Sequence, residues 1–373
     1  MFRRLIRIMT KTFEKPAEDK LNHVQSGGIE KSKEVKKERI KYGKYAMLLG
    51  YQGKQYYGMQ LQKDLPTIES HLLSAMHQAG WITEAQKEKP FDFFFQRAAR
   101  TDKAVSAARQ MCGMQLPRND DFYKTEGAKT LNALLPEDIR VFGIRRTINF
   151  FHPQKLCDYR TYRTHNFFNY TAKRAFNDMS CNRYIVSFEC GEPFLFKDEF
   201  RNEEVEFIQI TVKGQSFVLH QIRKMIGMVI TVIRELNLKS AIQKSFEGQR
   251  MDVPMAPGLG LLLERTHFDK YDEKNKKSHE PITVWTDEIE KEVDRTKFEL
   301  ITKEMLETEL RSQGMLKWLA DLVHHDFSGD AEAEEPPKQS FVTMAAACAN
   351  KAEKEQESSE SAENVEEVVV AAL

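Results

Sequence analysis

The sequence predicts an α+β fold of two similar halves with mainly antiparallel sheets, followed by a helical C-terminal extension. Two observations carry this expectation. Apolar runs of strand length recur on both sides of a middle segment, and stretches with apolar residues at helical spacing separate them. Hydrophobic residues make up 41% of the 373 positions, which is enough for a substantial core. The length suits two domains or one large one.

The first half, residues 42–152, alternates strands with helices. Residues 44–51 form a short apolar run and predict a buried strand. From Thr67 onward apolar residues recur at helical spacing, so we expect a helix that ends near Gly80. The remaining expected elements are a strand at 91–95 that enters a loop, a helix at 123–135 and a strand at 138–146.

The second half, residues 153–270, repeats this pattern. Residues 184–190 and 208–212 alternate apolar with polar side chains, as half-buried antiparallel strands do. The clearest helix runs from Ser216 to about Glu235 and carries one apolar stripe. Further expected elements are a helix at 238–247, a strand at 258–265 and a helix-rich extension at 271–326.

The charge balance, 56 basic against 56 acidic residues, conceals an uneven distribution. Residues 1–41 hold twelve lysines and arginines against six acids, whereas residues 327–373 hold three lysines against eleven acids. Because acidic, low-complexity sequence buries too little apolar area to offset its ordering entropy, we expect the tail to be disordered. The core, 42–326, is nearly balanced in charge, so its attraction to nucleic acid must come from local clusters of basic residues.

Two basic segments at the N-terminus indicate where the protein resides. The first twelve residues contain no acid and alternate basic with apolar side chains, as a mitochondrial presequence does; the alternative is a solvated basic terminus. The run 31–41 suits a nuclear address or a phosphate-attracting arm, or else a charged linker. We expect a nuclear and mitochondrial protein. No run approaches the roughly 18 consecutive apolar residues of a membrane span, so a transmembrane protein is excluded.

The five cysteines predict neither disulfides nor a metal centre. Their number is odd, and the sequence has no C-x-x-C pair and no nearby histidine cluster. We therefore expect a reducing compartment, with cysteines that mostly fill the core.

The segment 95–109, F-Q-R-A-A-R-T-D-K-A-V-S-A-A-R, is the most informative for chemistry. Asp102 lies among four cationic residues, which would hold its carboxylate ionised. On composition alone the commoner explanation is a structural ion pair. The alternative is a loop in which backbone-binding cations flank a nucleophilic aspartate, since carboxylates do act as covalent nucleophiles when ionised. The four cations are Arg97, Arg100, Lys103 and Arg109.

The run R-T-D-K-A-V-S-A at 100–107 resembles the catalytic loop of the TruA family of tRNA pseudouridine synthases, particularly its eukaryotic branch. Further blocks agree in the same order, and several ordered blocks are far more specific than one motif. The resemblance covers about 42–326 and neither tail. The further blocks are Y-Q-G-K-Q-Y-Y-G-M-Q at 51–60, C-D-Y-R-T-Y at 157–162, T-H-N-F at 164–167, K-G-Q-S-F-V-L-H-Q-I-R-K-M-I-G at 213–227 and V-P-M-A-P-G-L-G-L-L-L-E at 253–264.

This resemblance implies a mechanism and a catalytic set. Asp102 is expected to attack the target uridine, so that the base leaves its N1–C1′ bond, rotates and rejoins through C5. Tyr162 is expected to pack on the base and to take part in proton transfer, and Arg223, on its helix, to pair with the carboxylate of Asp102, orienting it and keeping it charged. Extruding the base costs a few kcal/mol, and stacking on an aromatic ring recovers about 1–3 kcal/mol.

The resemblance also implies how the substrate is held. The two halves are expected to meet at a central catalytic cleft, with no cofactor and no metal. The partner is expected to be tRNA, with small nuclear RNA or messenger RNA as further substrates, and the sequence indicates neither a membrane nor an obligatory protein partner. His220 serves either helix packing or RNA contact. The expected substrate-binding residues are Arg100, Tyr162, Lys103, His220, Leu261 and Leu263.

The chain departs from the family pattern twice. Ala104 stands where the family usually has glycine, which strains the loop if that position needs positive φ. Between Tyr162 and Thr164 the family carries several tens of residues, the rest of a strand and a long helix, whereas here only Arg163 intervenes. Such a loss should expose part of the sheet. An alternative function is therefore a catalytically impaired RNA-binding or folding factor.

Overall fold

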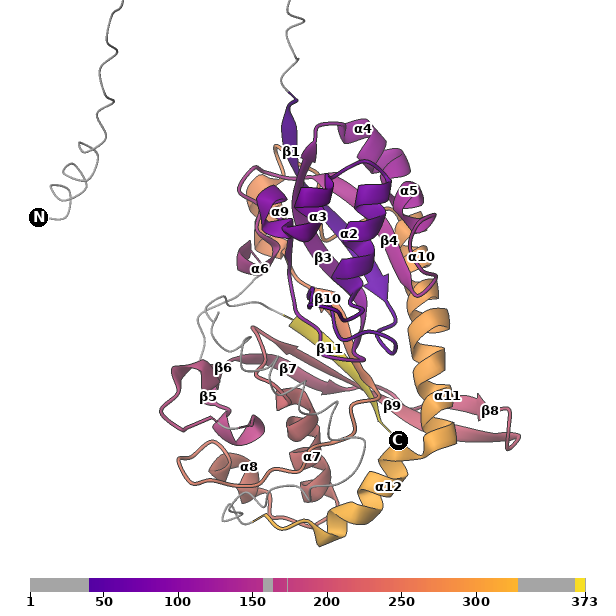
Figure 1. The fold of residues 1–373 in the computed structure, drawn as a ribbon. Coiled ribbons are helices and arrows are strands. Elements are labelled where there is room, and N and C mark those ends of the chain that lie inside the picture. Colours follow the sequence, from indigo (N-terminus) through magenta and orange to yellow (C-terminus); the bar gives the residue numbers. More distant parts are fainter. Residues whose placement is uncertain (1–39, 157–163, 173, 328–365, 373) are drawn as a thin grey trace, which may run out of the picture. The chain divides into compact units, whose positions relative to one another are not determined.

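The computed structural model describes residues 40–156, 164–172, 174–327 and 366–372, which form an α+β structure (Figure 1). In this part of the chain the main sheet has nine strands: β1 (Tyr42–Tyr51), β2 (Gln96–Arg97), β3 (Ser106–Pro117), β4 (Ile139–Arg146), β7 (Ile185–Cys190), β8 (Phe194–Asp198), β9 (Glu203–Gly214), β10 (Leu261–Thr266) and β11 (Glu366–Ala372). Seven of them follow the order β4-β1-β3-β10-β11-β9-β7, while β2 pairs with β3 and β8 with β9. Only β10 with β3 is parallel.

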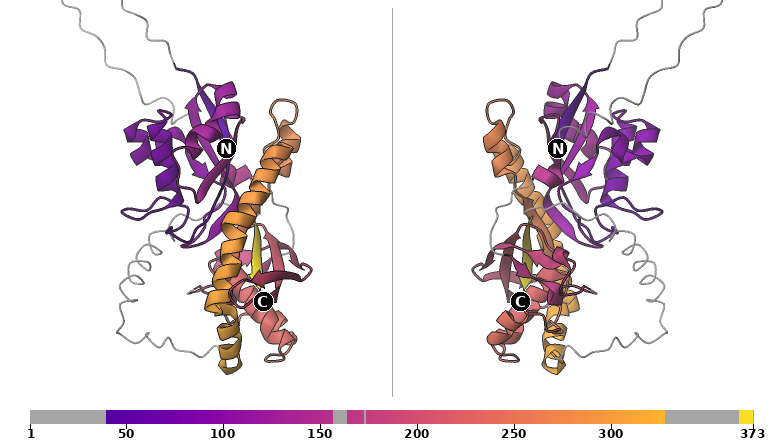
Figure 2. Two further views of the ribbon diagram at one scale, coloured as in Figure 1. Left: turned by 90° about the vertical axis from the view of Figure 1, so that its right-hand side faces the viewer. Right: turned by 90° about the vertical axis from the view of Figure 1, so that its left-hand side faces the viewer.

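The described helices are α2 (Ile68–Gln78), α3 (Glu84–Glu88), α4 (Asp120–Phe122), α5 (Ala128–Asn132), α6 (Pro153–Leu156), α7 (Gln221–Ile233), α8 (Ser240–Lys244), α9 (Asp269–Asn275), α10 (Asp287–Thr296), α11 (Lys303–Ser312) and α12 (Gly314–Asp321). A π-helical stretch, Lys297–Thr302, joins α10 to α11 in one long helical run (Figure 2). A separate small sheet pairs β5 (His165–Asn166) with β6 (Asn182–Arg183). Among these helices none is long and apolar enough to cross a bilayer.

Strand β1 separates two hydrophobic clusters, which explains why its sequence is apolar throughout. Tyr45 and Met47 belong to the cluster that contains the apolar side chains of α2 and α7. Ala46 and Leu48 belong to the cluster that contains Trp285 and side chains of α9 and α10. The predicted buried strand at 44–51 is confirmed, because a strand with both faces covered reads as a continuous apolar run.

The helix predictions hold with shifted boundaries. Helix α2 begins at a capping box in which the Thr67 hydroxyl accepts from the Ser70 N–H. Helix α7 begins at Gln221, five residues later than expected from Ser216, because His220 adopts a left-handed conformation with φ of 66°. Residues 271–326 contain most of α9 and all of α10, α11 and α12.

Two segments of the first half differ from the prediction. The expected strand at 91–95 is wrong: Pro90–Phe93 forms a 3₁₀ turn, since proline suits the first turn of a helix, and Phe94 ends it with φ of 54°. Strand β3 is absent from the sequence prediction. Its residues are almost all buried, so it has no polar alternation, and its alanines, Arg109 and Gln110 are not typical of strands.

The C-terminal end also differs from the prediction. Disorder is expected throughout 327–373, yet Glu366–Ala372 forms β11 between β10 and β9. The three consecutive valines in this run favour a strand because of their branched side chains. The rest of the tail, 328–365 and 373, lies outside the described residues, as do residues 1–39.

Candidate active site

Asp102 lies in a tight turn immediately before β3. The Val105 N–H donates to the Asp102 carbonyl oxygen over 3.1 Å and closes the turn. Ala104, the third residue of the turn, has φ of 63°, in the region that turns of this kind fill with glycine. The methyl group therefore strains this loop, and a non-glycine residue in the left-handed region costs about 1–2 kcal/mol.

The block 51–60 holds the turn from one side. The Ala104 N–H donates to the Tyr56 carbonyl over 3.0 Å, and the Met59 N–H donates to the Thr101 carbonyl over 3.1 Å. Gly58 has φ of 95°, and a Cβ atom there would lie 2.4 Å from the Thr101 oxygen. Only glycine therefore lets the two segments approach this closely.

Two further contacts bind the same block to the turn. The Gly53 N–H donates to the Ser106 hydroxyl over 2.9 Å. The ammonium group of Lys103 lies 4.3 Å from the centre of the Tyr57 ring, a cation–π contact. The sequence resemblance includes this block but gives it no role. Its backbone and Tyr57 support the Asp102 loop.

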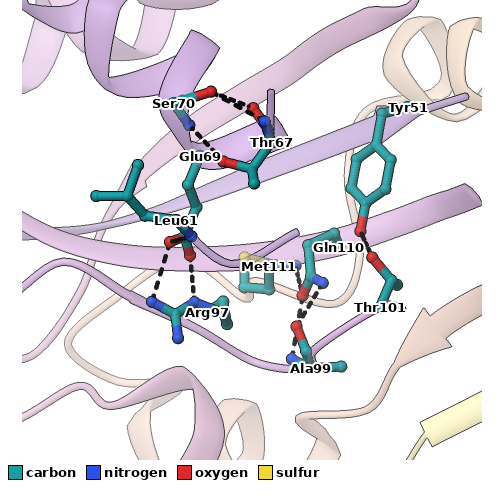
Figure 3. A network of polar contacts seen from close by, with 10 residues as sticks. All are labelled: Tyr51, Leu61, Thr67, Glu69, Ser70, Arg97, Ala99, Thr101, Gln110 and Met111. Carbon is teal, nitrogen blue, oxygen red and sulfur yellow. Dashed lines mark hydrogen bonds and ion pairs between the residues drawn. The ribbon is translucent and has the colours of Figure 1, made fainter. Parts of the chain in front are cut away.

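Figure 3 shows a polar network that includes Thr101, the residue before Asp102. The hydroxyl groups of Tyr51 and Thr101 are 2.8 Å apart in the interior. The side chain of Gln110, buried in β3, accepts from the Ala99 N–H over 3.2 Å and donates to the Ala99 carbonyl over 2.8 Å. A buried amide with its donor and acceptor used fixes the backbone it bonds, so this pair anchors the segment that leads into the turn.

Two of the four cations expected around Asp102 serve other partners. Arg97 pairs with Glu69, whose side chain is only 1% exposed and also accepts from the Leu61 N–H over 2.7 Å (Figure 3). Burial raises the pKa of Glu69, against the opposing charge of Arg97. Arg109 pairs with Glu290 of α10 at 2.5 Å. The expectation that all four cations surround Asp102 is therefore wrong for Arg97 and Arg109, which form ion pairs with carboxylates elsewhere in the fold.

The remaining electrostatics of Asp102 involve one arginine from each half of the chain. The residue is exposed, yet enough protein surrounds its carboxyl group that loss of hydration raises its pKa. The positive charges of Arg100 and, next, Arg223 oppose this shift. Both arginines expected near the carboxylate thus act on it, but they do not outweigh the loss of hydration.

Arg223 is held in place by the loop that precedes β10. The Nε of Arg223 donates to the Ala256 carbonyl over 2.7 Å, and the Ala256 N–H donates to the Arg223 carbonyl over 3.2 Å. A Cβ atom at Gly258 would lie 3.4 Å from the guanidinium carbon. Burial lowers the pKa of Arg223, while Asp102 raises it. The ion pairs among described residues do not include Asp102 with Arg223, so the positive charge of Arg223 acts on Asp102 here without the expected direct pairing.

The other expected site residues lie near this pair or outside the described residues. Leu263 is buried and Leu261 half-buried in β10, which runs parallel to β3 with Leu263 opposite Ala107, directly after the Asp102 loop. Arg100 and Lys103 are exposed on the loop itself. His220 immediately precedes α7. Tyr162 lies outside the described residues.

Sequence reasoning missed the residues that position the site rather than perform chemistry. They are Tyr51, Tyr57, Gly58, Thr101, Ala256 and Gly258. Most belong to the blocks at 51–60 and 253–264, so the signal was the glycines within those blocks. A glycine in a motif marks a close backbone approach even when its partner is unknown.

Asp102 thus lies in a strained turn at the start of a central strand, and arginines from two parts of an α+β chain influence its carboxyl group. A partly desolvated carboxylate with cationic neighbours is a candidate catalytic group.

A family model described as tRNA pseudouridine synthase matches residues 164–269. The chain is 36% identical over 332 residues to the pseudouridylate synthase 1 homolog of Mus musculus, covering 77% of this chain and 75% of that protein. Its human counterpart is 36% identical over 329 residues (76% and 74%). The tRNA pseudouridine synthase 1 of Yarrowia lipolytica is 27% identical over 351 residues (62% and 65%). The chain belongs to the tRNA pseudouridine synthase family.

Proposed function

We propose that the chain converts uridine to pseudouridine in tRNA, with Asp102 as the nucleophile. The observation that carries this proposal is the position of Asp102. It lies in a turn that is hydrogen-bonded to the block 51–60, and the positive charge of Arg223 on α7 acts to lower its pKa. The carboxylate of Asp102 forms a transient bond to the target nucleoside as the N1–C1′ bond breaks, and it is released when the rotated base forms the C5–C1′ bond. The C5 proton is lost to the medium and N1 takes up a proton, so the product has the composition of the substrate. The reaction is an isomerisation, so it needs no further reactant.

The substrate-binding roles follow from the same proposal. The target uridine enters a cleft between the two halves, one carrying Asp102 and the other Arg223. Arg100 holds the extruded nucleotide, and Tyr162 stacks on its base and transfers a proton. The apolar wall of the pocket consists of Leu261 and Leu263. Lys103 and His220 contact the RNA.

Substrate range and residence belong to the proposal as well. tRNA is the principal substrate, with small nuclear RNA and messenger RNA as further candidates, and no protein partner is required for turnover. The two basic segments at the N-terminus direct the protein to mitochondria and the nucleus. Confinement of a fluorescent fusion to the cytosol would contradict this part.

Release of tritium from C5 of uracil in tRNA tests the activity. The intact chain should release tritium, and Asp102→Asn should abolish release. Asp121→Asn, which changes an exposed carboxylate on α4, is the matched control and should leave the rate unchanged. No release by the intact chain, with tRNA binding that weakens with salt, would instead support the impaired RNA-binding factor.

A stability measurement distinguishes loss of the catalytic carboxylate in Asp102→Asn from unfolding of the variant. Because the folded state raises the pKa of Asp102, its contribution to stability is present below the ordinary pKa and is lost as the pH rises through the folded value. Asparagine does not ionise, so Asp102→Asn should be at least as stable as the parent chain at neutral pH. Urea unfolding measures this, and full release by Asp102→Asn would remove the proposal.

A further inference from the structure

The last strand of the chain lies in the middle of the sheet. Seven residues of β11 pair with β9, from Glu366 opposite Gly214 to Ala372 opposite Ile208. Its other edge pairs with β10, from Leu261 opposite Val370 to Thr266 opposite Glu366. Figure 1 shows β11 in yellow between these two strands. A C-terminal segment is thus paired along both of its edges.

Strand β11 joins the parts of the sheet that carry the two principal site residues. On one side, β10 pairs with β3, which begins four residues after Asp102. On the other side, β9 ends at Gly214, seven residues before α7 brings Arg223 to the site. In the described strand order β9 reaches β10 through β11. The strand therefore sets the spacing between the two groups within the sheet.

Without this strand, both neighbours would have unpaired edges. Strands β9 and β10 would each present a row of free N–H and C=O groups, which bind an added extended segment readily. In the described structure the segment that pairs with both edges is β11.

The C-terminus has the properties of such a segment. Residues 366–372, E-E-V-V-V-A-A, contain three consecutive β-branched residues and no proline or glycine. The 38 residues from 328 to 365 form a long connection, and the entropy of closing a loop grows only slowly with its length.

We propose that β9 and β10 form a binding slot for an extended, β-branched peptide, and that the chain's own Glu366–Ala372 is its ligand. An occupied slot fixes Arg223 relative to Asp102, so the C-terminus is part of the catalytic core. The slot itself is independent of the proposed function, whereas its effect on turnover depends on it.

Hydrogen exchange of the full-length chain tests the slot. Amides of 366–372 and of β9 and β10 should exchange slowly, because paired strands protect them. Val369→Pro removes a donor from a central strand, so it should remove that protection, whereas Val342→Pro, elsewhere in the C-terminal segment, should not. Exchange of 366–372 at the rate of an unstructured peptide in the parent chain would overturn the proposal, as would unchanged protection in Val369→Pro.

Rescue in trans tests ligand specificity on the same full-length variant. A synthetic peptide of residues 364–373, added to Val369→Pro, should restore protection of β9 and β10 in a saturable manner. The same peptide carrying the proline should not. Equal recovery with both peptides would contradict strand pairing.

Tritium release from tRNA then tests the link to catalysis. Val369→Pro should lower the rate about tenfold or more, because a misplaced catalytic group reacts slowly, and the wild-type peptide should restore it. A variant that loses protection and keeps its full rate would overturn the catalytic link. A parent chain that shows protection but no turnover would contradict the proposed function and leave the slot supported.

Discussion

Ala104 is the residue at which sequence and backbone disagree most. Its φ of 63° is favourable for glycine. The hydrogen bond from its N–H to the Tyr56 carbonyl, and the one that closes the turn from Val105 to Asp102, keep the backbone in this conformation. We expect Ala104→Gly to raise the free energy of unfolding by about 1 kcal/mol, because glycine adopts this conformation without strain. Urea unfolding measures the change.

A second alanine gives the control. Ala128 has helical φ and ψ of −63° and −45° at the start of α5, so Ala128→Gly should cost about 1 kcal/mol. Equal destabilisation by both substitutions would show that the turn at Ala104 carries no strain.

The pH dependence of the reaction reports on Arg223. Its charge lowers the pKa of Asp102, against the larger effect of lost hydration. Arg223→Gln should therefore raise that pKa further. Since Asp102 must be ionised to act as the proposed nucleophile, the acidic limb of the single-turnover rate should move to higher pH.

Arg223→Lys separates charge from geometry. Lysine keeps the positive charge but cannot reproduce the hydrogen bond from Nε to the Ala256 carbonyl, so the rate should fall while the acidic limb stays near its original position. If the limb of Arg223→Gln also stays in place, the charge of Arg223 has no influence on Asp102 during the reaction.

The sequence predicts individual site residues unevenly. Asp102, Arg100 and Arg223 come from motif blocks, and the structure brings their charges into mutual influence. The sequence does not reveal that Arg97 and Arg109 neutralise Glu69 and Glu290 instead, because both acids are distant along the chain. Local composition shows how many cations lie near Asp102 in the sequence, but the fold determines which carboxylate each cation pairs with.

At the scale of elements, helix α7 depends on a close approach at Gly227. A Cβ atom there would lie 1.9 Å from the Pro254 carbonyl oxygen, which belongs to the loop that holds Arg223. Because backbone atoms cannot move aside as a side chain can, Gly227→Ala should displace this loop. We expect the single-turnover rate to fall about 100-fold, as displacements near 1 Å do.

Gly127 provides a matched helical glycine. It has φ and ψ of −59° and −46°. An added Cβ would lie 3.1 Å from the terminal methyl of Ile144, which can move aside, and at ordinary contact distance, 3.5 and 3.6 Å, from Trp81 and Tyr123. Gly127→Ala should therefore keep the parent rate. Equal rates for both variants would mean that the loop does not position Arg223.

Elements with a clear periodic pattern are predictable and the others are not. The strand at 44–51 and the helices α2 and α7 follow from apolar spacing. Strand β3 escapes prediction because burial on both faces removes the alternation that identifies a strand. Strand β11 escapes because its signal is seven residues at the end of an acidic tail.

At the scale of the whole molecule, the pairing of distant strands cannot be predicted from the hydrophobic pattern of the sequence. The sequence predicts an α+β class with two similar halves, and the structure joins strands from both halves in one sheet through β3 and β10. This parallel pair connects residues more than 150 positions apart, Ser106 with Leu262. Periodicity describes each segment alone, so it cannot select such partners.

Charge is also organised over the whole chain. The acidic and basic totals cancel, but a basic surplus lies at the N-terminus, in residues 1–41, of which the structure describes only the last two. We expect replacement of the six basic residues in 31–41 by glutamine to weaken tRNA binding. The plot of log affinity against log salt concentration should become shallower by up to about six units, roughly one for each phosphate that is no longer neutralised.

Filter binding at several salt concentrations measures this slope, and tritium release at saturating tRNA should stay unchanged. Glutamine at the three lysines of the acidic tail is the control, since neighbouring acids already repel phosphate there. These lysines are Lys338, Lys351 and Lys354. An unchanged slope for the six-residue variant would identify 31–41 as a linker and leave RNA attraction to cations in the core, where Arg100 and Lys103 are exposed beside Asp102.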